Sequence, residues 1–297
     1  MADLHSDLIE KEFSSVDAVA LSPLVRRITA PNSGPMTGPG TNTYLLGRDD
    51  ITVIDPGPNI ESHVNAIYRA GGDNIKRIVV THTHPDHSPA AVPLAKLCGA
   101  DLIGCTISDD GHQDRSFKPD VDLYPQMLIE ARDHSLDAIA TPGHVGNHYC
   151  FYLREERMVF TGDHIMQGST VVIIPPSGDM ADYISSLQAL LAFQVDCLAP
   201  AHGHLMARAE KVVREIIDHR LARETKVIAG LQQHPNASLN QLVDVVYHDV
   251  DPRLKRIAGL SLWAHLLKLE KEGRARKRSE EHWLYGDELW SLTRTKD

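Results

Sequence analysis

Three histidines and one aspartate lie within six residues of this 297-residue chain, in the segment His82-Thr83-His84-Pro85-Asp86-His87. The segment follows a β-branched run at residues 77–80 and precedes a helical pattern at residues 89–97, so we expect it where a strand gives way to a loop. His82 and His84 are two positions apart and can project from one side of that strand end. Because imidazole and carboxylate groups are common ligands of transition metals, the cluster predicts a metal site.

Three more segments place a metal-competent side chain directly after an expected strand. They are Thr141-Pro142-Gly143-His144, Thr161-Gly162-Asp163-His164 and Pro200-Ala201-His202-Gly203. A single histidine at a strand end is more often structural, but four such strand ends in series are typical of a metal centre. The first cluster cannot complete two coordination spheres alone, whereas these segments supply the further ligands that two ions need.

The first two-thirds of the chain alternate between expected strands and amphipathic helices. Runs rich in β-branched residues predict strands at residues 43–46, 51–54, 77–80, 137–140, 148–153 and 158–160. Helical patterns lie between several of these runs, at residues 60–70, 89–97 and 183–193. Buried strands interleaved with such helices indicate sheets covered by helices, which is an α/β fold.

The pattern changes after His204, where the β-rich runs stop. Residues 207–232 form a long, charged helical stretch, and Ser238 is the expected N-cap of a short helix that follows it. A third helix carries an apolar stripe at nearly helical spacing and is expected to end at Gly273.

A β-hairpin is expected after the third helix, formed by the basic run at residues 274–278 and the segment at residues 282–285. Helices followed by such a hairpin outline a winged helix. We therefore divide the chain into a catalytic domain at residues 1–205 and a winged-helix-like domain at residues 206–297.

The spaced series of His-x-His-x-Asp-His, Gly-His, Asp and a last His resembles the metallo-β-lactamase superfamily. This resemblance implies an αββα sandwich with both metal ions at one edge of the paired sheets. His87 is present and no glutamate replaces His84, so the series is similar to that of the hydrolases rather than the di-iron oxygen-reducing branch. Residues 38–45 and 262–273 resemble the lactamase-β-like group with an appended winged helix, which includes a mitochondrial endoribonuclease and polyketide thioesterases.

The resemblance implies one ligand set for each of two metal ions, with Asp163 as the bridge between them. The first set is His82, His84 and His144, and the second set is Asp86, His87 and His202. A hydroxide between two ions about 3.5–4 Å apart would be the nucleophile. Asp163 and Asp86 are then the catalytic residues, because Asp86 would also orient that hydroxide. Zinc suits these ligands, and manganese or iron can occupy the same set.

Four further residues are expected to support the ligands or to contact substrate: Asp55, Asn147, His148 and His164. Asp55 resembles a loop acid that holds a ligand from behind, although a simple Asp-Pro-Gly turn explains it equally well. Asn147 and His148 could contact substrate or donate a proton. His164 lies beside Asp163 and is expected to support it rather than to bind metal.

Net charge separates the two expected domains and bears on the substrate. Residues 1–205 contain 13 Lys+Arg and 26 Asp+Glu, whereas residues 206–297 contain 17 and 14. An acidic catalytic domain would repel a polyanion, which favours a small acyl substrate such as a thioester, lactone or ester.

Two alternatives to an acyl substrate remain open. Cleavage of single-stranded RNA is one, because a winged helix with a basic run suggests nucleic-acid binding; a basic hairpin can equally be a solvated sheet edge. The other is a nucleic-acid-binding or scaffolding protein with a vestigial metal site, which the complete ligand set disfavours. Whether the winged helix binds nucleic acid or only shapes the cleft stays open.

The chain carries no sequence signal for a membrane or for export. No apolar run approaches the ~18 residues of a spanning helix, and the N-terminal segment has acids but no apolar core of the signal-peptide kind. The cysteines are scattered and expected to be reduced: Cys98, Cys105, Cys150 and Cys197. We therefore expect a cytoplasmic protein. The sequence carries no signal for the oligomeric state.

Overall fold

The computed structural model describes residues 8–9, 12–108, 110–278 and 288–293. Within this part of the chain, two seven-stranded sheets form most of the molecule. The first sheet contains, in order, β2 (Val19–Ala20), β3 (Val25–Thr29), β4 (Asn42–Leu46), β5 (Ile51–Ile54), β6 (Ile75–Val79), β7 (Asp101–Gly104) and β8 (Val121–Asp122). The second contains β1 (Leu8–Ile9), β14 (Leu205–Ala207), β13 (Cys197–Pro200), β12 (Met158–Gly162), β11 (Tyr149–Leu153), β10 (Ser135–Ala140) and β9 (Leu128–Glu130).

The two sheets pack face to face because their strands are apolar on both sides. In β4, Tyr44 and Leu46 lie in the core between the sheets, where the Tyr44 ring centroid is 4.9 Å from that of Phe160. The intervening Leu45 belongs to a second core with Val64 on the outer side. This alternation follows from the two-residue period of a strand, and burial on both faces requires a layer of helices outside each sheet.

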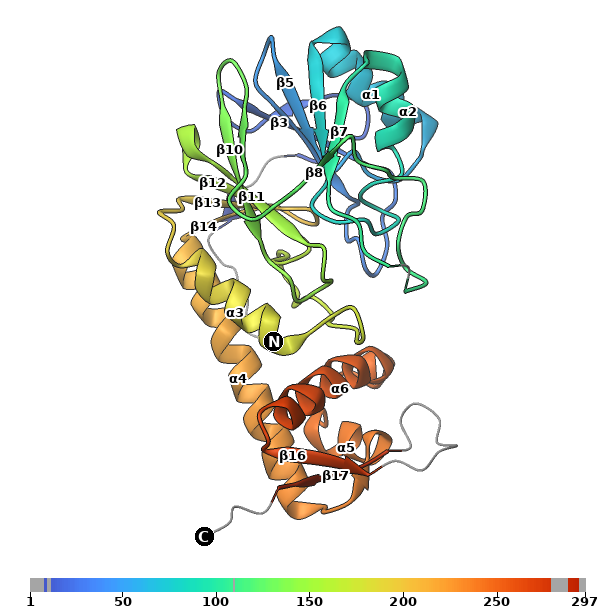
Figure 1. Ribbon diagram of the computed structural model, residues 1–297, viewed down its shortest axis with the longest axis vertical. Coiled ribbons are helices and arrows are strands. Elements are labelled where there is room, and N and C mark those ends of the chain that lie inside the picture. Colours follow the sequence, from blue (N-terminus) through green and yellow to red (C-terminus); the bar gives the residue numbers. More distant parts are fainter. Residues whose placement is uncertain (1–7, 10–11, 109, 279–287, 294–297) are drawn as a thin grey trace.

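Helices supply those outer layers, as Figure 1 shows. The first sheet is covered by α1 (Glu61–Gly71) and α2 (Ala91–Cys98), and the second by α3 (Met180–Leu190) and the first half of α4 (Ala209–Gln233). The predicted αββα sandwich is therefore confirmed. Helix α3 begins three residues earlier than predicted, because the Asp179 carboxylate caps it by accepting hydrogen bonds from the backbone N–H groups of Ala181 and Asp182.

The C-terminal part has the arrangement of a winged helix, as predicted. It contains α5 (Leu239–Val246), α6 (Lys255–Lys271) and a small sheet of β15 (Ala237–Ser238), β17 (Leu289–Leu292) and β16 (Ala275–Arg278). Ser238 caps α5 in a capping box with Gln241, and Gly273 follows α6 with a left-handed φ of +71°, so both predicted helix boundaries are confirmed. The basic run forms β16, and its partner is β17; the predicted partner segment at residues 282–285 lies outside the described residues.

Helix α4 belongs to two cores. Its first half packs with α3 against the second sheet, through Val213 and Ile217 among others, whereas Val227 and Leu231 belong to the core of the C-terminal unit. Figure 1 shows this helix running from the sandwich into the C-terminal unit. The division at 205/206 stays a prediction, and it precedes a helix that both parts share. Among the described residues, no helix has the length and hydropathy of a membrane span.

Candidate metal centre

Four loops meet at one edge of the sandwich, and each follows the end of a strand. Strands β10 and β12 run in the same direction because each pairs antiparallel with β11, and β13 is parallel to β12. Their C-terminal ends therefore lie at one edge, and they lead to His144, Asp163 and His202 respectively. The end of β6 in the other sheet leads to the predicted cluster of residues 82–87. The seven predicted ligands are thus brought together from both sheets.

The first ligand group has His84 at its centre. The His84 Nδ1 atom lies 2.9 Å from His82 Nε2 and 3.1 Å from His144 Nε2. The Asp163 Oδ2 atom lies 3.7 Å from His144 Nε2. One ligand atom from each of these four residues lies within 4.8 Å of the others, which is the spacing of groups that converge on one ion.

The second group contains Asp86, His87 and His202, whose ligand atoms also lie within 4.8 Å of one another. The Asp86 Oδ2 atom is 3.3 Å from His202 Nε2 and 3.6 Å from His87 Nε2. The other oxygen of Asp163, Oδ1, faces this group at 3.1 Å from His202 Nε2 and 3.5 Å from His87 Nε2. The two oxygens of Asp163 therefore face different groups, as a bridging carboxylate requires.

Buried polar atoms at the centre lack protein partners in the described structure, which fits the binding of cations there. His87 Nε2 and Asp163 Oδ1 are buried and have no hydrogen-bond partner among the described residues. Burial and the nearby histidines lower the pKa of His84 to about 4, which keeps its imidazole neutral and free to bind metal. Burial opposes protonation of His202, but Asp163 and Asp86 outweigh it and raise its pKa to about 9. The two carboxylates therefore favour a positive charge in this half of the site, on His202 or on a bound cation.

In four of the histidines, the ring nitrogen that faces away from the centre contacts an oxygen. The oxygens are Val172 O for His144 Nδ1 (2.9 Å), Asp55 Oδ2 for His87 Nδ1 (3.0 Å), Thr81 Oγ1 for His82 Nδ1 (3.0 Å) and Gly40 O for His202 Nδ1 (3.4 Å). Each contact favours the tautomer whose Nε2 lone pair points to the centre. The two carbonyl acceptors were not predicted, because a backbone oxygen leaves no signal in residue type.

Asp55 lies behind the second group. Its Oδ1 accepts a hydrogen bond from Thr81 N (2.7 Å), and its Oδ2 accepts one from Thr81 Oγ1 (2.7 Å) as well as that from His87. Asp55 adopts a left-handed φ of +49°, a conformation that aspartate tolerates better than most residues. These contacts favour the supporting role over a simple turn former.

Asn147 and His148 are only 1% exposed, which leaves no surface for substrate. The Asn147 amide donates to Thr83 Oγ1 and to Cys105 O, both at 2.8 Å. His148 Nε2 accepts a hydrogen bond from the backbone N–H of Asp163 (3.2 Å). These contacts with Thr83 and Asp163 favour the supporting alternative for both residues over contact with substrate.

His164 is fully buried beside Asp163 and lies outside both ligand groups. Its ring centroid is 4.9 Å from that of Tyr183, and its ring nitrogens have no hydrogen-bond partner in the described part of the chain. The Tyr183 hydroxyl donates to the His164 carbonyl at 2.9 Å, so this residue connects the Asp163 loop to α3.

A cleft of about 300 Å³ opens beside His202. Its wall includes the apolar side chains of Pro35, Met36, Pro39, Met166 and Val172, and no Lys, Arg, Asp or Glu of the described residues lines it. The loops that form it follow β3, β12 and β13, and the cleft adjoins the second ligand group because His202 itself lines it. No residue of α5 or α6 lines it, so the described C-terminal unit does not form its wall.

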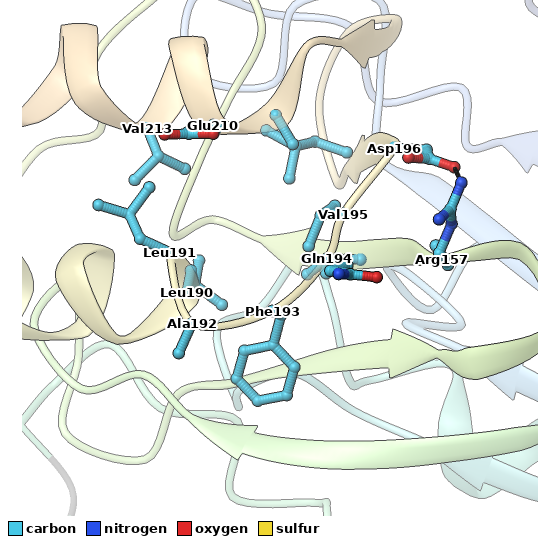
Figure 2. Close-up of a pocket in the computed structure, with 13 residues that line it drawn as sticks. Arg157, Leu190, Leu191, Ala192, Phe193, Gln194, Val195, Asp196, Glu210 and Val213 are labelled. Carbon is cyan, nitrogen blue, oxygen red and sulfur yellow. Dashed lines mark hydrogen bonds and ion pairs between the residues drawn. The ribbon is translucent and has the colours of Figure 1, made fainter.

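Another hollow, of about 440 Å³, lies away from the ligands. Figure 2 shows it between the end of α3 and the start of α4, lined by Leu190, Phe193 and Val213, with the Arg157–Asp196 ion pair at one side. None of the predicted ligands borders it, so it has no part in the metal centre.

Comparison with known proteins agrees with both parts of the fold. The family model described as metallo-beta-lactamase superfamily matches residues 36–202, and that described as beta-lactamase associated winged helix domain matches residues 238–283. The chain is 32% identical over 271 residues to a beta-lactamase-like protein 2 homolog of Caenorhabditis elegans, covering 85% of this chain and 86% of that protein. It is 29% identical over 236 residues to an atrochrysone carboxyl ACP thioesterase of Passalora fulva, covering 76% and 67%. A beta-lactamase domain protein from Burkholderia ambifaria superposes with a TM-score of 0.80 at 19% identity and 97% coverage of each chain.

Proposed function

The chain belongs to the metallo-beta-lactamase superfamily, and on that premise we propose that it hydrolyses a small acyl substrate, a thioester, lactone or related ester, at a two-metal centre. The observation that carries the acyl substrate is the largely apolar cleft beside His202, whose described lining includes no Lys, Arg, Asp or Glu. Such a wall suits an acyl group, since specific small-molecule sites are mostly apolar with a few polar groups. The thioesterase named among the relatives supports the same class of substrate.

RNA cleavage is less well supported by the described residues. A polyanion requires cationic contacts, and the cleft has neither lysine nor arginine. Part of the basic run is already neutralised: Arg274 pairs with Glu224 and Glu272, each at 2.9 Å, and Lys277 Nζ lies 3.6 Å from Glu270. The run therefore offers fewer free cations than its sequence suggests.

In the proposed mechanism, the ligand residues hold the centre and orient the nucleophile. When bound, the two metal ions would polarise the scissile carbonyl and make a water molecule acidic enough to attack near neutral pH. The side chain of Asp86 is 28% exposed, so its carboxylate can accept a hydrogen bond from that water. Burial opposes ionisation of Asp86, but His87 and His202 outweigh it and lower its pKa, which keeps the carboxylate an acceptor.

Asp163 would help to hold the metal at both groups, because its two oxygens face them, while the buried His148 accepts a hydrogen bond from the backbone N–H of Asp163. Zinc as the native metal, two ions per chain and a cytoplasmic location belong to the same proposal. Nitrogen and oxygen ligands of this kind suit zinc.

The test is a parallel assay of zinc-loaded protein against thioesters, lactones and single-stranded RNA. We expect turnover of an acyl substrate, and we expect Asp163→Ala and His84→Ala to lose metal and activity together. The loss should exceed the ~10–100-fold that outer-shell contacts cost, because these residues would touch the ions directly. Metal content by elemental analysis and initial rates are the measurements.

His248→Ala is the matched control, since this exposed histidine lies on the C-terminal unit. It should keep wild-type metal content and rate. Fewer than one metal ion per wild-type chain would contradict the metal centre, and preferential cleavage of RNA would contradict the acyl substrate.

A further inference from the structure

We propose that Arg220, on α4, positions the metal ligand His144 by holding the backbone at Val171 and Val172. The inference rests on the ligand role proposed for His144. Arg220 is 3% exposed, and its Nη2 donates a hydrogen bond to Val171 O. The next carbonyl, Val172 O, accepts the hydrogen bond from His144 Nδ1 at 2.9 Å. Two hydrogen bonds, one to Val171 O and one to Val172 O, therefore connect α4 to His144 at the metal centre.

The segment between these contacts has little support of its own. Residues 163–179, between β12 and α3, contain no helix or strand, so no ladder of hydrogen bonds fixes the position of Val172 O. Val171 and Ile173 are buried in the core beneath α3 and α4, and the intervening Val172 lines the cleft beside the ligands. Arg220 and His144 therefore bind neighbouring carbonyls of the same segment.

The same arginine also reaches the Asp163 loop through Tyr183. The Arg220 guanidinium carbon lies 5.1 Å from the Tyr183 ring centroid, and the Tyr183 hydroxyl donates to the carbonyl of His164. The backbone of Tyr183 packs so closely on Gly143 that a Cβ built there would lie 2.3 Å from Tyr183 Cα. Arg220 and Tyr183 thus contact the neighbours of two ligands, His144 and Asp163.

The electrostatic cost of Arg220 argues against a role in packing alone. Within the described ranges no carboxylate forms a salt bridge with it, and its Nε has no hydrogen-bond partner. Glu224, one turn further along α4, is occupied by Lys268 and Arg274. A buried guanidinium without a counter-ion is unfavourable, so an apolar side chain would fill this space at lower cost. What the arginine adds is a donor that reaches Val171 O.

The experiment compares metal binding by full-length wild-type protein, Arg220→Met and Arg220→Lys. Zinc affinity is measured by competition with a chelator, and the ligand geometry by the visible absorption spectrum of cobalt-substituted protein. We expect Arg220→Met to weaken binding of the more affected ion by about 10–100-fold, the usual effect of losing an outer-shell contact, and to change the cobalt spectrum. Arg220→Lys, which keeps a cationic donor, should recover part of both.

Arg214→Met is the matched control, because Arg214 is an exposed arginine on the same helix whose partner is Glu210. It should leave affinity and spectrum unchanged. Wild-type affinity together with a wild-type cobalt spectrum in Arg220→Met would overturn the proposal. If circular dichroism shows that Arg220→Met does not fold, Arg220→Gln is tested instead. The side chain of glutamine is too short to reach Val171 O, and zinc affinity and the cobalt spectrum are measured in the same way.

Both readouts are independent of any substrate. Failure of the wild-type protein to hydrolyse acyl compounds would therefore remove the proposed function and leave the role of Arg220 standing. Unchanged metal binding in the arginine variants would remove that role, whichever substrate the wild-type enzyme accepts.

Discussion

At the scale of single residues, the orientation of each histidine depends on the acceptor behind it. His144 and His202 face carbonyl oxygens, whereas His87 faces the carboxylate of Asp55. A carboxylate is the strongest of these acceptors because the hydrogen bond is charge-assisted. It also brings negative charge toward the second group, and Asp55 is one of the three carboxylates that raise the pKa of His87 despite its burial. The second ion should therefore be the more sensitive to this contact.

Asp55→Asn tests that expectation while keeping the backbone. Asparagine also tolerates the left-handed φ of +49°, so the turn should survive. Its single amide oxygen cannot accept from both His87 Nδ1 and the backbone N–H of Thr81, which the two carboxylate oxygens do. We expect the affinity for one of two zinc ions to fall by about 10–100-fold, measured by titration with chelator competition.

The control for this variant is Asp133→Asn, because Asp133 forms a similar contact with His134 at 2.9 Å away from the metal centre. It should bind two ions as the wild type does. Two ions bound at wild-type affinity in Asp55→Asn would show that the carboxylate is only a turn former.

At the scale of elements, the features that could be predicted are those encoded locally. Ser238 with Gln241 marks the start of α5, and Gly273 marks the end of α6, because capping depends on residues within one turn. The strand ends that carry the candidate ligands could likewise be predicted from the sequence, since each combines an apolar run with a metal-competent side chain. The carbonyl of Val172 and the side chain of Arg220 could not be assigned, because their contacts join segments 28 and 49 residues apart.

The contact between α4 and α6 yields a prediction about pH. Glu224 accepts hydrogen bonds from Lys268 Nζ (2.7 Å) and Arg274 Nη1 (2.9 Å). Burial opposes its ionisation, but the neighbouring His265, whose Nδ1 lies 3.9 Å away, and these two cations outweigh it and lower the pKa to about 2 from an ordinary 4.5. A folded-state pKa below the unfolded value stabilises the fold above pH 4.5, and that contribution is lost as the pH falls from about 4.5 to about 2.

We therefore expect Glu224→Gln to lower the free energy of unfolding by on the order of 2 kcal/mol at pH 7, with the difference from wild type vanishing near pH 2. Urea unfolding of both proteins across this range measures it. Glu210→Gln is the control, because its pair with Arg214 is exposed and contributes little. A difference between wild type and Glu224→Gln that does not depend on pH would contradict this account.

At the scale of the whole molecule, α4 determines where the chain can be divided. The residues of its first half that are buried against α3 and the second sheet include Val212, Val213, Ile216 and Ile217. Burial of four such side chains contributes roughly 6–12 kcal/mol. A whole domain is stable by only about 5–15 kcal/mol, so the sandwich needs this half of the helix.

Two shortened chains separate the alternatives for the domain boundary. A chain that ends at residue 207 lacks α4 and leaves Tyr183 and Leu187 of α3 uncovered on that side, so we expect it to aggregate or to bind a hydrophobic dye. A chain that ends at residue 234 keeps α4 and Arg220, so it should fold and bind metal, though with Val227 and Leu231 exposed and a lower melting temperature. Size-exclusion chromatography and zinc content measure both. If the shorter chain is monomeric and binds two zinc ions, the boundary lies at 205/206 and α4 belongs to the C-terminal unit. If only the longer chain is monomeric and binds zinc, α4 is part of the catalytic domain. We expect the second result, because the first half of α4 is buried against the sandwich.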